Sequence, residues 1–176
     1  MNIFRSAGFA IGVVIGLVLV VILFKAANKD HKIKTEYDER QKIIRGRAYM
    51  YSFYAVLIYE AVMILFDLAN ASFPIEGSIL HFGAILFGCM VLACYSIWTG
   101  VYWGLNNDRK KYAVIFVIVG IFNLVPVWAA YKSGELIENG RLGTPFVNLL
   151  VVIMMFILGA EMIVKLIMDA RAAEEE

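Results

Sequence analysis

Five apolar blocks follow one another along this chain of 176 residues, and each is close to the about 20 residues that a helix needs to cross a membrane. Hydrophobic residues make up 61% of the chain, well above the roughly 45 to 50% of soluble domains. The sequence therefore predicts an all-α, polytopic integral membrane protein with five transmembrane helices in one domain, residues 1–176. The expected spans cover residues 7–24, 48–68, 79–104, 112–131 and 145–168.

The 16 Lys and Arg residues are divided unevenly between the two sides that five spans create. Arg5, Lys132 and Arg141 fall on one side, and the other 13 fall on the opposite side. Cytoplasmic loops retain an excess of Lys and Arg. We therefore expect the N-terminus outside and the C-terminus in the cytoplasm of a multi-pass cell-membrane protein, with residues 25–47 as a basic cytoplasmic segment.

The second half of this basic segment resembles the start of a helix. Thr35 can cap backbone N–H groups, and Asp38 follows three residues later. Glu36 with Arg40, and Asp38 with Lys42, are spaced i to i+4 with the acid first, which is the favourable order. We expect a cytoplasmic helical extension that begins at Thr35 and runs into the second span.

Two kinds of partner suit the segment 25–47, in addition to the bilayer itself. Its eight basic and four acidic residues favour anionic lipid, because each basic residue near an anionic leaflet gains about 1 kcal/mol. A membrane-protein partner is the alternative. The net charge of +1 gives no indication of nucleic-acid binding. The docking candidates are Asp38, Glu39, Arg40, Arg45 and Arg47.

The residues Tyr37-Asp38-Glu39-Arg40-Gln41, followed by Ile44-Arg45-Gly46-Arg47-Ala48-Tyr49, form a juxtamembrane signature directly before an apolar block. This signature resembles that of small multi-span membrane proteins of bacteria and archaea whose function is uncharacterised. Arg47 stands where those families more often have Lys, which keeps the charge and changes the hydrogen-bond geometry. The resemblance covers about 20 residues and implies a multi-span fold in a bacterial or archaeal plasma membrane, without an activity to transfer.

Glu60 is the most unusual position within the apolar blocks, because it lies about 12 residues into the second one. An acidic side chain near the bilayer centre costs roughly 2.5 to 3.5 kcal/mol, so it should face other helices or water. Asn123 lies at nearly the same depth in the fourth block, and Ser96 lies somewhat nearer the cytoplasm. We expect Glu60 to contact Asn123, either as a packing contact or as part of an ion or proton pathway.

Two stripes of small residues predict places where helices approach closely. The candidate packing residues are Gly8, Gly12 and Gly16 in the first block and Gly88, Gly100 and Gly104 in the third. The facing helix can belong to the same chain or to a second copy, so a homodimer is one expected arrangement.

Motifs of known enzymes and metal sites are missing from the sequence. It lacks the spacings of zinc proteases, serine hydrolases and phosphate-binding loops, and its loops are short. We therefore expect no enzyme activity, cofactor or metal. A scaffold or accessory subunit for another membrane protein is the favoured function, and a small transporter or ion-coupled permease using Glu60 and Asn123 is the alternative.

Overall fold

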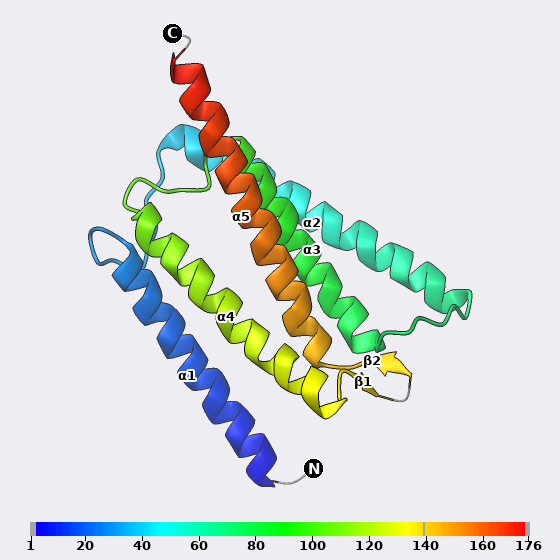
Figure 1. Ribbon diagram of the computed structural model, residues 1–176. Coiled ribbons are helices and arrows are strands. Elements are labelled where there is room, and N and C mark those ends of the chain that lie inside the picture. Colours follow the sequence, from blue (N-terminus) through cyan, green and yellow to red (C-terminus); the bar gives the residue numbers. More distant parts are fainter. Residues whose placement is uncertain (1–2, 139, 175–176) are drawn as a thin grey trace. The chain divides into compact units, whose positions relative to one another are not determined.

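The computed structural model describes the backbone of residues 3–138 and 140–174 and the side chains of residues 14–137 and 140–174. The described backbone is helical apart from loops and one short hairpin (Figure 1). The chain divides into two compact units. The first combines Met1–Asp38 with Trp103–Ile115, and the second combines Glu39–Tyr102 with Phe116–Glu176.

Four helices are long and apolar enough to cross a membrane. They are α2 (Glu39–Leu68), α3 (Gly77–Trp98), α4 (Arg109–Ser133) and α5 (Pro145–Glu174). These helices confirm the helical architecture, and four of the five expected spans coincide with helices long and apolar enough to cross a membrane. A further helix, α1 (Ile3–Ala27), carries a shorter apolar stretch at Val14–Ala27 within the part whose side chains are described. The expected span at residues 7–24, which lies on α1, and the orientation of the chain stay predictions.

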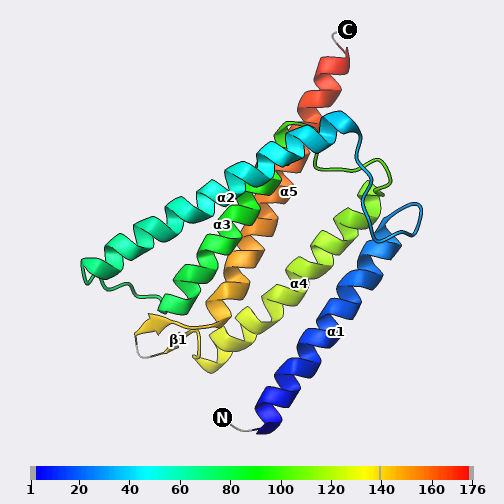
Figure 2. The ribbon, with the colours of Figure 1, turned by 180° about the vertical axis from the view of Figure 1, so that it is seen from behind.

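In the second unit, α3 lies between α2 and α5 and packs against both (Figure 2). The contact with α2 is close because Gly88 has no side chain. The hydroxyl of Ser52 on α2 donates a hydrogen bond of 2.7 Å to the Gly88 carbonyl oxygen. Gly83, farther toward the start of α3, faces the ring of Tyr59 in the same way. Gly88 therefore lies at a close helix contact, as the sequence predicted.

The predicted stripe on α3 is wrong at its C-terminal end, because the helix ends at Trp98 and leaves Gly100 and Gly104 outside it. Gly100 has φ of 72°, a left-handed conformation that commonly terminates helices. On α1, a side chain at Gly16 would meet open space within the chain. Gly8 and Gly12 lie outside the residues whose side-chain surroundings are described.

A two-stranded antiparallel hairpin connects α4 to α5. Its strands are β1 (Ile137–Glu138) and β2 (Arg141–Leu142). The backbone of Leu142 also joins the loop between α2 and α3, since its N–H donates to the Pro74 carbonyl at 2.8 Å and its carbonyl accepts from the Glu76 N–H at 3.2 Å. The connection between α4 and α5 is therefore hydrogen-bonded to the connection between α2 and α3.

The first unit brings the end of α1 against the start of α4. The ring of Tyr112 lies edge-on to Phe24 and to Trp103, with centroid distances of 6.3 and 5.5 Å. The Lys111 ammonium group donates a hydrogen bond of 3.0 Å to the carbonyl oxygen of Ala26. These contacts hold the end of α1, where one loop of this unit begins, next to the start of α4, where the other loop ends.

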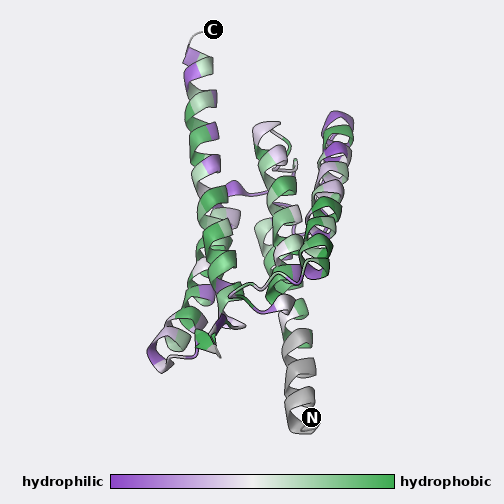
Figure 3. Ribbon diagram, turned by 90° about the vertical axis from the view of Figure 1, so that its right-hand side faces the viewer, coloured by the Kyte–Doolittle hydropathy of each residue, from purple (hydrophilic) through white to green (hydrophobic). Residues whose placement is uncertain are grey.

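Most large apolar side chains on the helices remain exposed within the chain, as expected when the surrounding medium is lipid. Phe156 on α5 is 79% exposed and Phe122 on α4 is 72% exposed. Figure 3 shows hydrophobic residues along the middle of the helices, with hydrophilic residues mixed in toward the C-terminus of α5. This pattern agrees with helices that cross an apolar layer.

The contact at Gly88 leads to a stability prediction. A Cβ atom at this position would lie 2.5 Å from Cγ2 of Val56 and 3.2 Å from Oγ of Ser52. We expect Gly88→Ala to lower the free energy of unfolding by about 1 to 3 kcal/mol, because overpacking forces α2 and α3 apart. Thermal unfolding in mild detergent measures the change.

Gly120→Ala on α4 is the matched control, because open space surrounds that position. The control should unfold at the same temperature as the unaltered protein or slightly higher, since alanine favours helices. Equal losses in the two variants would contradict the close contact.

Candidate functional site

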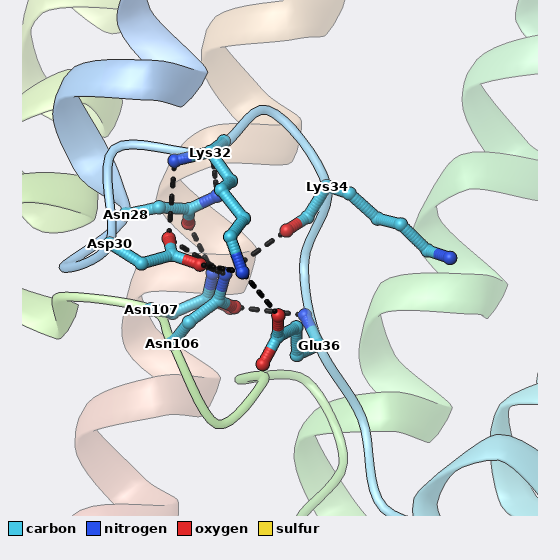
Figure 4. A network of polar contacts seen from close by, with 7 residues as sticks. All are labelled: Asn28, Asp30, Lys32, Lys34, Glu36, Asn106 and Asn107. Carbon is cyan, nitrogen blue, oxygen red and sulfur yellow. Dashed lines mark hydrogen bonds and ion pairs between the residues drawn. The ribbon is translucent and has the colours of Figure 1, made fainter.

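Two loops of the first unit are joined into one body, which we call the loop platform and define as residues 28–38 and 103–108 (Figure 4). Backbone hydrogen bonds connect the two loops at two points, and a third bond joins the second loop to the end of α1. The N–H of Lys29 donates to the Asn106 carbonyl at 2.8 Å, and the N–H of Leu105 donates to the Glu36 carbonyl at 2.8 Å. The N–H of Asp108 donates to the carbonyl of Ala27 at 3.1 Å.

Asn28 closes α1 and is completely buried. Its side-chain amide donates a hydrogen bond of 2.7 Å to the Lys32 carbonyl, which turns the chain back on itself. Its side-chain oxygen accepts from the amide of Asn107 at 2.7 Å and from the hydroxyl of Tyr112 at 3.2 Å. Donor and acceptor groups of Asn28 are therefore satisfied inside the protein.

Asn106 binds the loop before α2 at several points. Its side-chain oxygen accepts the backbone N–H of Glu36 at 2.9 Å. Its side-chain amide donates to the Asp30 carboxylate at 3.1 and 3.2 Å and to the Lys34 carbonyl at 3.0 Å. One side chain that is 7% exposed thus fixes three points of a segment about 70 residues away in sequence.

Asn107 performs the same task for its own loop. Its side-chain oxygen accepts the backbone N–H of Gly104 at 2.7 Å, while its amide donates to Asn28 and, at 3.5 Å, to the hydroxyl of Thr35. A side chain at Gly104 would collide with Thr35 and with the Glu36 carbonyl oxygen. Gly104, expected at a helix contact, is therefore needed where two loops touch.

The acidic and basic side chains of the platform complete the network at its surface. Lys32 lies 3.1 Å from the Glu36 carboxylate and 3.5 Å from that of Asp30. The hydrogen bond and charge of Glu36, with the charge of Asp30, raise the pKa of Lys32. Desolvation acts to raise the pKa of Asp30, but hydrogen bonds from Lys32 and Asn106 and the Lys32 charge outweigh it and lower that pKa.

The platform corrects the expected start of the juxtamembrane helix. We expected this helix to begin at Thr35, but α2 begins at Glu39. The backbone of Glu36 bonds to Asn106 and Leu105 instead of to a helical turn. Glu36 consequently pairs with Lys32, and Lys42 pairs with Glu39 at 2.6 Å, in place of the expected partners.

The docking candidates fall into both units. Asp38 is exposed in the first unit, and Glu39, Arg40, Arg45 and Arg47 lie on α2 in the second. The Arg45 side chain makes hydrogen bonds within the chain, because its guanidinium donates to the Val101 carbonyl at 3.4 Å and to the Tyr49 hydroxyl at 3.0 Å. Arg40 and Arg47 are exposed and line an open pocket near the start of α2.

Glu60 contacts His81 of α3, with 2.8 Å between the carboxylate Oε2 and the ring Nδ1. The two side chains are 32% and 51% exposed. The expected contact between Glu60 and Asn123 is therefore wrong, because α3 lies directly against α2 and supplies the nearer partner. The pair can hold a proton between a carboxylate and an imidazole.

Asn123 and Ser96 are both used within their own helices. The Asn123 amide donates to the Val119 carbonyl at 2.8 Å, and the Ser96 hydroxyl donates to the Leu92 carbonyl at 2.6 Å. Ser96 is almost completely buried. These bonds satisfy a polar group inside an apolar helix without a partner from another helix.

The asparagines of the platform are the main feature that sequence reasoning missed. The adjacent pair Asn106 and Asn107, and Asn28 at the end of an apolar block, looked like ordinary loop residues. Asparagine is common in turns because its amide bonds to nearby backbone groups. Asparagine in a loop does not by itself indicate a long-range contact, so the sequence did not predict that these residues meet across nearly 80 positions.

Comparisons of the chain with protein-family models, with curated proteins and with solved structures find no match. The resemblance of the juxtamembrane signature to small multi-span proteins therefore stays a prediction.

Asn107→Ala tests whether the network holds the loops together. The substitution leaves the buried Asn28 oxygen and the Gly104 N–H short of a partner, so we expect local stability to fall by about 1 to 3 kcal/mol. Hydrogen exchange should accelerate in residues 28–38 and 103–108. Lys29→Ala is the control, because it removes an exposed side chain and keeps the backbone bond. Unchanged exchange in Asn107→Ala would refute the role of the network.

Proposed function

We propose that the chain is a non-enzymatic integral membrane protein that acts as a scaffold or accessory subunit for another membrane protein. The observation that supports this proposal is the loop platform. Its two loops are joined by buried, hydrogen-bonded asparagines, and they carry charged side chains at the surface. We place the platform on the cytoplasmic side because Lys and Arg gather in these loops.

The physical argument rests on conformational entropy. Fixing each residue of a loop costs roughly 1 to 2 kcal/mol of conformational entropy. A loop that is already ordered avoids this cost when a partner binds. The four or more hydrogen bonds that Asn106 and Asn107 each make keep the platform ordered, so a partner can dock on it without that cost.

The chemistry of the platform favours a partner with acidic and hydrogen-bonding groups. Lys29 and Lys34 are exposed, and no ion pair engages either within the described part of the chain. Lys32, between them, is 65% exposed although it contacts two carboxylates. A cytoplasmic acidic segment of a neighbouring membrane protein fits this arrangement.

Neutralising the two exposed lysines tests the proposal. We expect Lys29→Gln with Lys34→Gln to reduce co-purification of one partner protein by tenfold or more, because the docking charge is lost and the fold remains. Purification in mild detergent, with identification of bound proteins and measurement of particle mass, gives the result.

The control is Lys132→Gln with Arg141→Gln, which removes the same charge from the side predicted to be outer. If co-purification of the partner falls equally in the platform variant and in the control variant, docking at the platform is contradicted. A particle with the mass of one chain and nothing bound would contradict the accessory function altogether, and a particle of two chains would make the protein its own partner.

A second function has support in the pair of Glu60 and His81. A carboxylate and an imidazole 2.8 Å apart can exchange a proton, and ionisable groups in apolar helices often lie on ion or proton pathways. A proton-coupled transporter would use this pair, with Asn123 as a further candidate on α4. The pair is equally able to join α2 to α3.

Proton flux separates these readings of Glu60. For a transporter, Glu60→Gln should abolish proton uptake into vesicles that contain the purified protein, because the amide cannot carry the proton. His81→Gln should have the same effect. For a scaffold, neither substitution alters flux, which stays at the level of empty vesicles before and after the change.

A further inference from the structure

Besides the loop platform, the second unit contains an open polar pocket of about 580 Å³ where α2 begins and α3 ends. Its lining comes from three separate places in the sequence. The pocket residues are Arg40, Ile44 and Arg47 of α2, Tyr95 and Trp98 of α3, Thr99 and Gly100 after α3, and Lys165 of α5. Three of these residues are cations, and none is acidic.

We propose that this pocket binds the phosphate group of an anionic phospholipid from the membrane leaflet next to the loops that are rich in Lys and Arg. The inference goes beyond partner docking, and either can hold without the other. The first argument is charge. Arg40 and Arg47 are seven residues apart, so they project from one face of α2 about 10 Å apart. Among the described residues, no carboxylate pairs with either guanidinium.

Lys165 supplies the third charge from α5. It contacts Asp169, one turn later on the same helix, at 2.5 Å. Asp169 is 60% exposed and does not line the pocket, so a phosphate would approach Lys165 from the pocket side. A guanidinium group can donate two parallel hydrogen bonds to two oxygens of one phosphate, and an ammonium group adds a point charge. The three cations exceed the charge of one phosphodiester.

The pocket walls are held by contacts of their own. The guanidinium of Arg45 on α2 donates to the Val101 carbonyl just after α3. The rings of Tyr51 on α2 and Tyr95 on α3 lie edge-on with centroids 5.1 Å apart. These contacts keep the cations of α2 at a fixed distance from the end of α3. The helices that form two walls of the pocket are therefore joined to each other beside it.

A lipid fits better than a soluble phosphate because of what borders the pocket. Trp98 is 45% exposed at the end of an apolar helix, where aromatic rings prefer the headgroup layer. Ile44 lies between the two arginines on the same face of α2. A phosphate beside Trp98 and Ile44 would have its acyl chains directed along helices that are apolar beyond this point. Basic pockets between membrane helices bind anionic headgroups in this manner.

The experiment measures lipid retained by the purified full chain after reconstitution in nanodiscs, transfer to mild detergent and native mass spectrometry. We expect bound phosphatidylglycerol and little bound phosphatidylcholine at equal supply. In Arg40→Gln with Arg47→Gln, apparent affinity should fall roughly 30-fold, because each of the two cations removed contributes roughly fivefold. Arg47→Lys keeps the charge and should bind several-fold more weakly than the unaltered protein.

The control is Lys29→Gln with Lys34→Gln, which removes two charges from the loop platform. Equal loss of lipid in the two double variants would overturn the proposal, because it would show attraction to the overall charge. If the purified chain binds inorganic phosphate but retains no anionic lipid, the pocket is a site for soluble phosphate, and the lipid proposal is overturned. No retained anionic lipid would overturn it as well.

The variants also separate this inference from the proposed docking function. Arg40→Gln with Arg47→Gln should retain any protein partner while it loses lipid, and the platform variant should show the reverse. Circular dichroism and elution volume verify that each variant is folded. If the double arginine variant does not fold, Arg47→Lys still decides the question through its reduced lipid retention.

Discussion

Backbone groups that leave a helix at a membrane surface must find new hydrogen-bond partners, because each unpaired buried group is costly. In this chain the side chains of three asparagines supply those partners for both loops of the first unit. Asn28, Asn106 and Asn107 each donate and accept, which no apolar residue of similar size can do. The order of the loop platform depends on this property, and so does the close approach at Gly104.

A different solution holds the second unit together. Here α3 is the central helix, and its small residues let α2 approach until the Ser52 hydroxyl reaches the Gly88 carbonyl. Direct packing of this kind replaces the hydrophobic effect, which does not distinguish lipid from protein inside a membrane. The hairpin between α4 and α5 then ties the opposite ends of the helices to the loop between α2 and α3 through Leu142.

The sequence predicted the helices well because length and hydropathy determine whether a segment can cross a membrane. Four of the expected spans correspond to helices of suitable length, and Gly88 lies where a small residue was expected to matter. Helix ends were harder. The third helix ends at Trp98, and Gly100 just beyond it takes a left-handed conformation, although the expected span continued to residue 104.

Contacts between distant residues were the least predictable part. Depth in the membrane suggested Asn123 as the partner of Glu60, but depth does not say which helices are neighbours. His81 was available because α3 follows α2 through a short loop. Likewise, the capping pattern at Thr35 is genuine locally, yet Asn106 offers the same backbone groups a partner from elsewhere. Local preference was overruled by contacts that a single sequence does not reveal.

The hydrogen bond between Asn28 and Asn107 also imposes an order on biosynthesis. The two residues are separated by 79 positions, and both the second and the third apolar segments are made between them. At about 5 to 20 residues per second, Asn28 waits roughly 4 to 16 s for its partner. During that interval the end of α1 holds an amide whose final partner does not yet exist. The first unit contains the first helix to be synthesised, yet it is completed only after the segments that form α2 and α3 have been made.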